Sequence, residues 1–288
     1  MFDSLGDRMK KYEKTETGRK FMPLLPVVAR IDGKAFHTWT KGLDRPFDAD
    51  MIQIMQNTTK KLVEETSAKV GYTQSDEISL VFYSDDIESQ IFFDGKIFKM
   101  TSVLASMTTA IFNEKILSLA GNLYNDSTCY ETETTRRLNK IVTKPMALFD
   151  CRVWQMPTKE EVCNYLVWRE QDAVRNSIQS VGQANFSQKQ LHGKSQKEIQ
   201  EMLFQEKDIN WNDCLIAEKR GTYFQKRQVE RMFSVNELTK LPEKHEAKKN
   251  PYLKVLRNDI VTLNMPRLAS IDNRIEVVFD GAEPVIKR

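Results

Sequence analysis

The order of apolar runs and helical stripes in the first part of the chain constrains its fold most strongly. Residues 27–31 form a β-rich apolar run that stops at Asp32-Gly33, a typical turn pair. Residues 48–68 carry apolar side chains three and four positions apart, which predicts a helix. Asp48 is its expected N-cap. Residues 78–83 then form a second β-rich run, so the sequence predicts a β-α-β unit.

The alternation continues along the chain. Residues 97–120 repeat apolar side chains at spacings of three and four, which predicts the clearest helix, with Gly121 ending it. Residues 148–154 predict a further strand, and residues 90–93 a weaker one.

Two capping boxes mark helix starts in the second half of the chain. Thr158 precedes an expected helix over residues 158–182, and Ser195 precedes a shorter one. The resulting order is β-α-β-(β)-α-β up to residue 154. We therefore expect an α+β fold, a split β-α-β arrangement with helices on one face of a mainly antiparallel sheet.

Composition indicates a soluble intracellular protein. The 288 residues are 40% hydrophobic and 29% charged, which suits a globular protein with a core. The longest uncharged stretch, residues 100–113, is shorter than the roughly 18 residues that a membrane span needs, so we expect no membrane partner. No secretory signal is expected, and we predict a cytoplasmic location. The cysteines show no C-x-x-C pair and are expected to be reduced; they are Cys129, Cys151, Cys163 and Cys214.

The charge is unevenly spread. The net charge is only +3, but residues 219–257 hold 11 Lys and Arg residues against four Glu, with Tyr and Phe interleaved. A second basic run lies within residues 136–144. Clustered cations with aromatic residues are typical of a nucleic-acid surface, and a solvated basic face is the alternative.

Carboxylates stand at the ends of two predicted strands. Asp32 follows the first run, and Asp76-Glu77 precede the next. Each motif alone is most often a turn or a polar loop. In a β-α-β unit the two strand ends can be neighbours, and Mg²⁺ favours such hard oxygen ligands shared with phosphates. Two such ions can hold both oxygens of a phosphoryl transfer, so the pairing predicts a phosphoryl-transfer site.

Several motifs together resemble the tRNA-His guanylyltransferase family. They occur in the same order as in that family and extend over nearly the whole chain. The motifs are R-I-D-G-K-A-F-H at 30–37, Y-T-Q-S-D-E-I-S at 72–79, F-D-C-R-V at 149–153, N-Y-L-x-W-R-x-x-D at 164–172, N-x-N at 210–212 and K-R-G at 219–221.

The resemblance implies a 3′-5′ nucleotidyltransferase on a polymerase-palm-like (ferredoxin-like) fold. The expected substrates are tRNA, GTP and ATP, with two Mg²⁺ ions held by Asp32, Asp76 and the Gly33 carbonyl. Asp32, Asp76 and Glu77 are the expected catalytic residues. The residues expected to bind the nucleotide are Asp32, Gly33, Lys34, Ala35, Phe36, His37, Ser75 and Asp76.

Further residues are expected to contact the tRNA or its 5′ phosphates. Lys96 and Lys99 share one face of a helix start, although two solvated lysines would look the same. The full set by resemblance is Lys96, Lys99, Arg152, Asn176, Lys219 and Arg220. The resemblance also suggests a homotetramer.

One departure from the family pattern bears on the substrate. Eukaryotic members carry H-I-N-N where this chain has Val174-Arg175-Asn176-Ser177. This favours the guanylyltransferase-like branch, which repairs 5′-truncated tRNA with the opposite strand as template. The alternatives are tRNA-His guanylyltransferase proper, which adds a single G, and a non-catalytic RNA-binding module.

The expected organisation has two parts. Residues 1–145 would form the palm-like catalytic region with the metal and nucleotide site. Residues 146–288 would complete the sheet, contribute tRNA contacts and include a mostly helical, basic extension.

Overall fold

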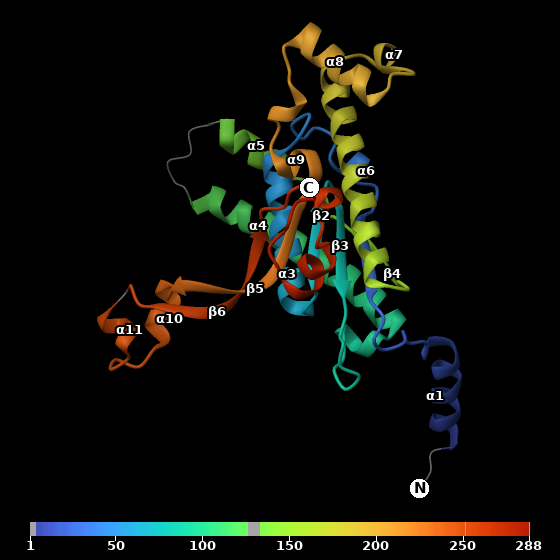
Figure 1. Ribbon diagram of the computed structural model, residues 1–288, viewed down its shortest axis with the longest axis vertical. Coiled ribbons are helices and arrows are strands. Elements are labelled where there is room, and N and C mark those ends of the chain that lie inside the picture. The colour runs from blue at the N-terminus through green and yellow to red at the C-terminus, as the bar shows by residue number, and fades with distance from the viewer. Residues whose placement is uncertain (1–3, 126–132, 251, 288) are drawn as a thin grey trace.

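The computed structural model describes residues 4–125, 133–250 and 252–287. Its centre is one six-stranded sheet in the order β4-β1-β3-β2-β5-β6, in which every neighbouring pair is antiparallel (Figure 1). The strands are β1 (Val27–Gly33), β2 (Val70–Gln74), β3 (Glu77–Phe82), β4 (Phe149–Gln155), β5 (Thr222–Met232) and β6 (Lys254–Leu263). The predicted α+β class with an antiparallel sheet is confirmed.

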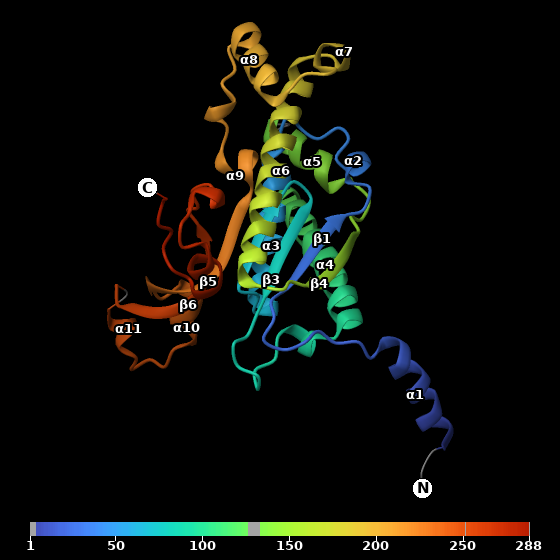
Figure 2. The same ribbon diagram turned by 45° about the vertical axis from the view of Figure 1, so that its right-hand side comes forward.

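The described parts of the chain also form helices, some packed on the sheet and others, such as the N-terminal helix, projecting from it (Figures 1 and 2). They are α1 (Ser4–Thr17), α2 (Phe36–Trp39), α3 (Ala49–Thr66), α4 (Ile97–Asn125), α5 (Glu133–Val142), α6 (Lys159–Asn185), α7 (Gln188–Leu191), α8 (Gln196–Lys207), α9 (Ile216–Arg220), α10 (Val235–Lys240) and α11 (Glu246–Lys249). Within the described ranges, no helix combines the length and apolar composition needed to cross a membrane.

Two helices cover one face of the sheet. Asp48 caps α3 as expected, and its Oδ1 accepts a hydrogen bond from the Met51 amide at 2.9 Å. Leu104 of α4 and Leu80 of β3 belong to the core between the layers. The helix α4 continues past Gly121, where an end was predicted, because one glycine inside a helix costs only about 1 kcal/mol.

The other face of the sheet is also covered, which differs from the expected one-sided arrangement. Leu166 of α6 and Val277 of the C-terminal segment pack against Val28, Tyr72 and Val81 there. The central strands bury apolar side chains on both faces, so both faces need a cover. In Figure 2, α6 crosses in front of the sheet, while β1 and β4 lie to one side of it.

One strand was missed by the sequence analysis, and one predicted strand is absent. The strand β2 was missed because Gly71 interrupts its apolar pattern; a Cβ at Gly71 would lie 2.5 Å from Val63 of α3, so the glycine allows close packing. The weak strand expected at residues 90–93 is not present. That segment leads into the 3₁₀ turn η1 (Phe92–Gly95).

The basic stretch at residues 219–257 is mainly a β ribbon. β5 and β6 pair from Tyr223↔Leu263 to Met232↔Lys254 and carry α10 and α11 beyond the body of the protein (Figures 1 and 2). The expectation of a mostly helical extension is therefore wrong for this stretch. The side chains of β5 beyond Gln225 alternate between exposed and half-buried, with charged groups on both faces, so no apolar period marked the strand.

Candidate active site

The predicted carboxylates converge at one end of the central strands. Asp32 on β1 lies opposite Glu77 on β3 and opposite Asp150 on β4 in the sheet register. Asp76 occupies the turn between β2 and β3, and its carbonyl accepts a hydrogen bond from the Gly33 amide at 3.2 Å. This bond joins the two motifs that lie 44 positions apart in the sequence.

The backbone on each side of the carboxylates is unusual. Ala35 has φ 55° and Ser75 has φ 50°, left-handed conformations that cost energy in residues other than glycine. Gly33 lies against the ring of Phe36, and a Cβ there would come 2.2 Å from it. Such strained conformations are concentrated at functional sites, and here they lie close in sequence to Asp32 and Asp76.

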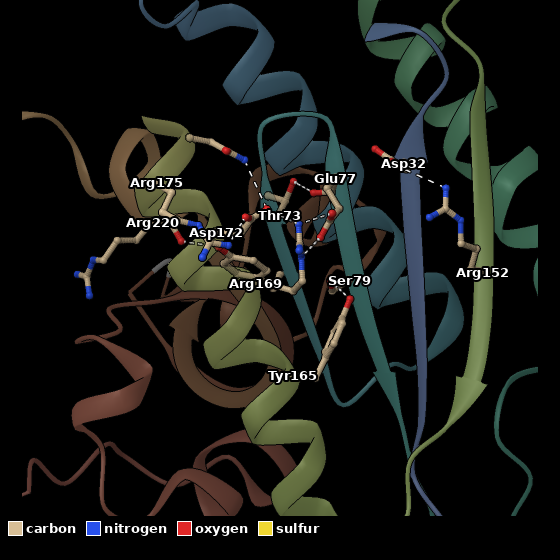
Figure 3. A network of polar contacts seen from close by, with 12 residues as sticks. Asp32, Thr73, Glu77, Ser79, Arg152, Tyr165, Arg169, Asp172, Arg175 and Arg220 are labelled. Atoms are coloured by element: carbon tan, nitrogen blue, oxygen red, sulfur yellow. Dashed lines mark hydrogen bonds and ion pairs between the residues drawn. The ribbon is translucent and has the colours of Figure 1, made fainter. Parts of the chain in front are cut away.

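Glu77 is held by an arginine from α6. Arg169 donates from Nε and Nη2 to the two Glu77 oxygens, each at 2.7 Å, and both side chains are buried. Burial raises the pKa of Glu77, and the Arg169 guanidinium counters this shift. Figure 3 shows that the network extends through Asp172, 3.0 Å from Arg169, to the exposed Arg175.

The Asp32–Asp76 pair provides an acidic site of the type that binds Mg²⁺. Burial raises the pKa of Asp76, the hydrogen bond from Ser75 opposes that shift, and the negative charge of Asp32 adds to it. No cluster of three His, Cys, Asp or Glu side chains arranged for a metal occurs in the described residues. Mg²⁺ does not require one, because it keeps several waters and shares substrate phosphates, so two carboxylates with the Gly33 carbonyl fit this ion.

A pocket of about 310 Å³ opens beside the β2–β3 turn. His37, Ser75 and Asn176, all predicted site residues, line it together with residues of the α2–α3 loop, α3, α6 and α9. Concave sites of this size are typical of small-molecule binding. The pocket therefore lies next to Asp76, on the α6 and α9 side of the carboxylates.

Other residues expected to bind the nucleotide take different positions. Lys34 is exposed, and its amide donates to the Leu148 carbonyl. Phe36 is buried in an aromatic cluster with Trp39 and Phe149, so its side chain belongs to the core. Only the backbone of Phe36 remains for the nucleotide contact that the sequence predicts.

Lys96 and Lys99 lie at the opposite end of the sheet within this chain. β3 begins at the carboxylates and ends at Phe82, and α4 begins beyond that end. The helix then returns, so that Phe112 packs against Phe36 beside the site. The stretch of α4 from Lys99 to Phe112 spans about 20 Å. The contact of Lys96 and Lys99 with the 5′ phosphates stays a prediction.

The remaining predicted tRNA contacts divide into two groups. Arg152 lies at the site, with Nη2 4.0 Å from Asp32 (Figure 3). The same Nη2 lies 3.3 Å from Asp150. Lys219 donates to the Asn212 carbonyl. Arg220 is only 16% exposed and pairs with the buried Glu170 at 3.3 Å, which gives it a structural role.

Sequence reasoning missed the role of Arg169. It was part of a quoted motif but had no function assigned. The available indication was a charged residue four positions after Tyr165, on the face of α6 that meets the sheet. Tyr165 itself shares a hydrogen bond with Ser79 of β3 at 2.8 Å.

Comparison with known proteins decides the family. A family model described as tRNAHis guanylyltransferase matches residues 6–157, just over half of the chain. The chain belongs to the tRNA(His) guanylyltransferase family. Its resemblance to the guanylyltransferase-like branch is confirmed, and as a family member the chain is a nucleotidyltransferase.

Solved structures of bacterial tRNA(His) guanylyltransferase-like proteins are similar over most of the chain. One, in complex with ATP, is 41% identical with a TM-score of 0.66, covering 78% of this chain and 87% of that chain. Another, in complex with GTP, is 33% identical with a TM-score of 0.66, covering 93% and 94%. The tRNA(His) guanylyltransferase of Saccharomyces cerevisiae is 26% identical over 72% of this chain and 85% of its own length.

Proposed function

We propose that the chain is a Mg²⁺-dependent 3′-5′ nucleotidyltransferase that repairs truncated tRNA 5′ ends. The observation that carries this proposal is the pair Asp32 and Asp76, brought together at the strand ends beside the pocket. Supporting it are the guanylyltransferase-like relatives bound to ATP and to GTP. The palm-like character of the sheet is part of the same proposal.

In this proposal, the nucleoside triphosphate and the tRNA 5′ end approach the carboxylates from different sides. The pocket lined by His37 and Ser75 would take the incoming nucleoside triphosphate, because it is concave and close to Asp76. The tRNA 5′ end would approach over β1 and β4, where Arg152 is half exposed near Asp32. In this arrangement the reacting groups would meet at the proposed metal site, one from each side.

The chemistry is transfer to the 5′ end. The 3′-oxygen of the incoming nucleotide forms a bond to the 5′-phosphorus of the tRNA, the group that activates this phosphate leaves, and the hydroxyl proton passes to solvent. Asp32, Asp76 and the Gly33 carbonyl would hold two Mg²⁺, which supply charge neutralisation and favour ionisation of the attacking hydroxyl. Arg169 occupies both carboxylate oxygens of Glu77, so the role of Glu77 is to position the β2–β3 turn.

Template pairing would select the added nucleotide. Val174, Arg175 and Ser177 replace three positions of the H-I-N-N element, and only Asn176 remains, on the pocket wall. Pairing with the opposite tRNA strand can supply the discrimination that the side chains do not. The alternative is single G addition to tRNA-His, the activity in the names of the eukaryotic relatives.

The test is incorporation of labelled nucleotide into a tRNA that lacks its first nucleotide. Asp76→Asn and Asp32→Asn should each abolish transfer in the presence of Mg²⁺, with an unchanged circular dichroism spectrum. Asp85→Asn is the matched control, because Asp85 is an exposed carboxylate beyond the far end of β3. Near-normal transfer by either site variant would contradict the assignment of the carboxylates.

A further inference from the structure

Trp168 is exposed to solvent, whereas a tryptophan that only fills the core would be buried. It lies on α6 directly before Arg169, and 46% of it is accessible to solvent. By contrast, Trp39 and Trp211 are buried in the core. A large exposed ring that is not needed to fill the core is available to a ligand.

A short series of contacts links Trp168 to the candidate active site. The Arg169 guanidinium carbon lies 4.5 Å from the centroid of the Trp168 ring. The same guanidinium binds Glu77, and Glu77 lies opposite Asp32 in the sheet. Since paired strands are about 4.8 Å apart, Trp168 lies near the carboxylates rather than on a remote surface.

The helix geometry gives the direction in which Trp168 faces. Leu166 and Glu170, on one flank of α6, contact the C-terminal segment, where the Leu268 amide donates to Glu170 at 2.9 Å. Tyr165, on the sheet-facing side, packs edge-on against Trp154 of β4 at 5.4 Å. Trp168 lies on the flank away from Leu166 and therefore faces the surface of β1 and β4. Figure 2 shows this part of the sheet beside α6.

Arginines lie on that surface. Arg30 of β1 and Arg152 of β4 are opposite each other in the register, on the same face of the sheet as Asp32. Among the described residues, the buried Nε of Arg30 has no hydrogen-bond partner. Arg152 is half exposed, and Arg175 is on the same flank of α6 as Trp168, seven positions further on. An exposed indole beside partly exposed arginine side chains fits a base and its phosphate.

We propose that Trp168 stacks on a base at the 5′ end of the tRNA, while Arg30 and Arg152 contact the adjoining phosphates. This inference rests on the proposed function and deepens it by assigning the RNA strand to the β1–β4 side. The occupant is a base of the RNA rather than the base of a free nucleotide. The reason is that an open surface covers only one face of a base. The concave pocket lined by His37 and Ser75 would surround a small ligand on several sides instead.

Tryptophan fluorescence tests the proposal without depending on catalysis. A 5′-truncated tRNA is titrated into the full chain without nucleoside triphosphate, so that no transfer occurs. Stacking on Trp168 should quench the emission, and Trp168→Phe should remove most of that quenching while still binding the tRNA. Trp168→Ala should weaken tRNA binding about 5- to 150-fold, the range that alanine substitution gives for base–aromatic stacking.

Two controls make the outcome decisive. Phe204→Ala removes an exposed aromatic side chain on α8 and should change neither quenching nor affinity. Free ATP should quench wild type and Trp168→Phe equally. Quenching retained in Trp168→Phe, wild-type affinity in Trp168→Ala, or Trp168-dependent quenching by ATP alone would each overturn the proposal. Trp168-dependent quenching by tRNA, combined with no transfer by wild type in the separate assay with labelled nucleotide, would instead reject the proposed function and keep the inference.

Discussion

At the scale of single residues, the ion pair between Glu77 and Arg169 holds the start of β3, next to the β2–β3 turn that carries Asp76. Both side chains are buried, and removing one partner leaves a buried charge without compensation. Arg169→Met should therefore destabilise the protein by about 3 to 5 kcal/mol in urea denaturation. The double variant Glu77→Gln with Arg169→Met should recover much of this loss, because it buries no unpaired charge. A double variant that is no more stable than Arg169→Met would contradict this account.

The buried thiol of Cys163 predicts how stability depends on alkaline pH. Burial raises the pKa of Cys163 to about 11, while in the unfolded chain it titrates near 9.0. The raised pKa stabilises the folded state below pH 9.0, and this contribution is lost as the pH rises towards 11. It amounts to about 3 kcal/mol at 1.36 kcal/mol per pH unit.

Cys163→Ala isolates this contribution. Urea midpoints of wild type and variant, measured from pH 7 to 10.5, should converge as the pH rises, because only the wild type loses the thiol contribution. Cys151, whose pKa burial raises to about 12, stays in both proteins and cancels. A constant difference between the two midpoints would show that burial does not shift this thiol. Of the cysteines expected to be reduced, Cys129 lies outside the described residues.

At the scale of secondary-structure elements, the β5–β6 ribbon separates paired from unpaired cations. Arg231 contacts Glu237 at 2.7 Å and Asp259 at 2.5 Å, and Lys254 contacts Glu230 at 3.3 Å. Such cations are already neutralised within the ribbon. The local excess of positive charge therefore overstates the number of phosphates that this segment can bind.

Lys226 and Lys249 are the better candidates for phosphate contacts. Both are exposed, and within the described residues neither forms an ion pair. If both touch phosphates, Lys226→Ala with Lys249→Ala should reduce the salt slope of tRNA binding by about 1.4 to 1.8 units. Arg231→Gln is the matched control and should destabilise the ribbon without changing the slope. An unchanged slope in the double variant would identify these lysines as part of a solvated face.

Elements with a clear apolar period could be predicted, and those without one could not. The strands β1, β3 and β4 and the helices α3, α4 and α6 followed from their patterns. The ribbon did not, because charged side chains occupy both of its faces, and β2 did not, because Gly71 interrupts it. The pairing of Glu77 with Arg169 joins residues 92 positions apart, so it depends on how α6 packs rather than on any local pattern.

At the scale of the whole molecule, the sheet combines both halves of the chain. β4 and β5 come from residues 146–288, yet they flank β1, which carries Asp32, and the β2–β3 pair, whose turn carries Asp76. The predicted division at residue 145, the homotetramer and the cytoplasmic location stay predictions. In the proposed arrangement, the incoming nucleotide occupies the pocket on the α6 and α9 side of the carboxylates, and the tRNA lies over β1 and β4.

The central claim is templated repair by the Asp32–Asp76 site, and one comparison of initial rates tests it most directly. The enzyme is given each nucleoside triphosphate in turn with tRNA lacking its first nucleotide, and GTP with intact tRNA-His. We expect faster addition to the truncated tRNA, and the preferred nucleotide should change when the opposing template base is changed. Faster addition of G to intact tRNA-His, whatever the template base, would contradict templated repair and favour tRNA-His guanylyltransferase proper.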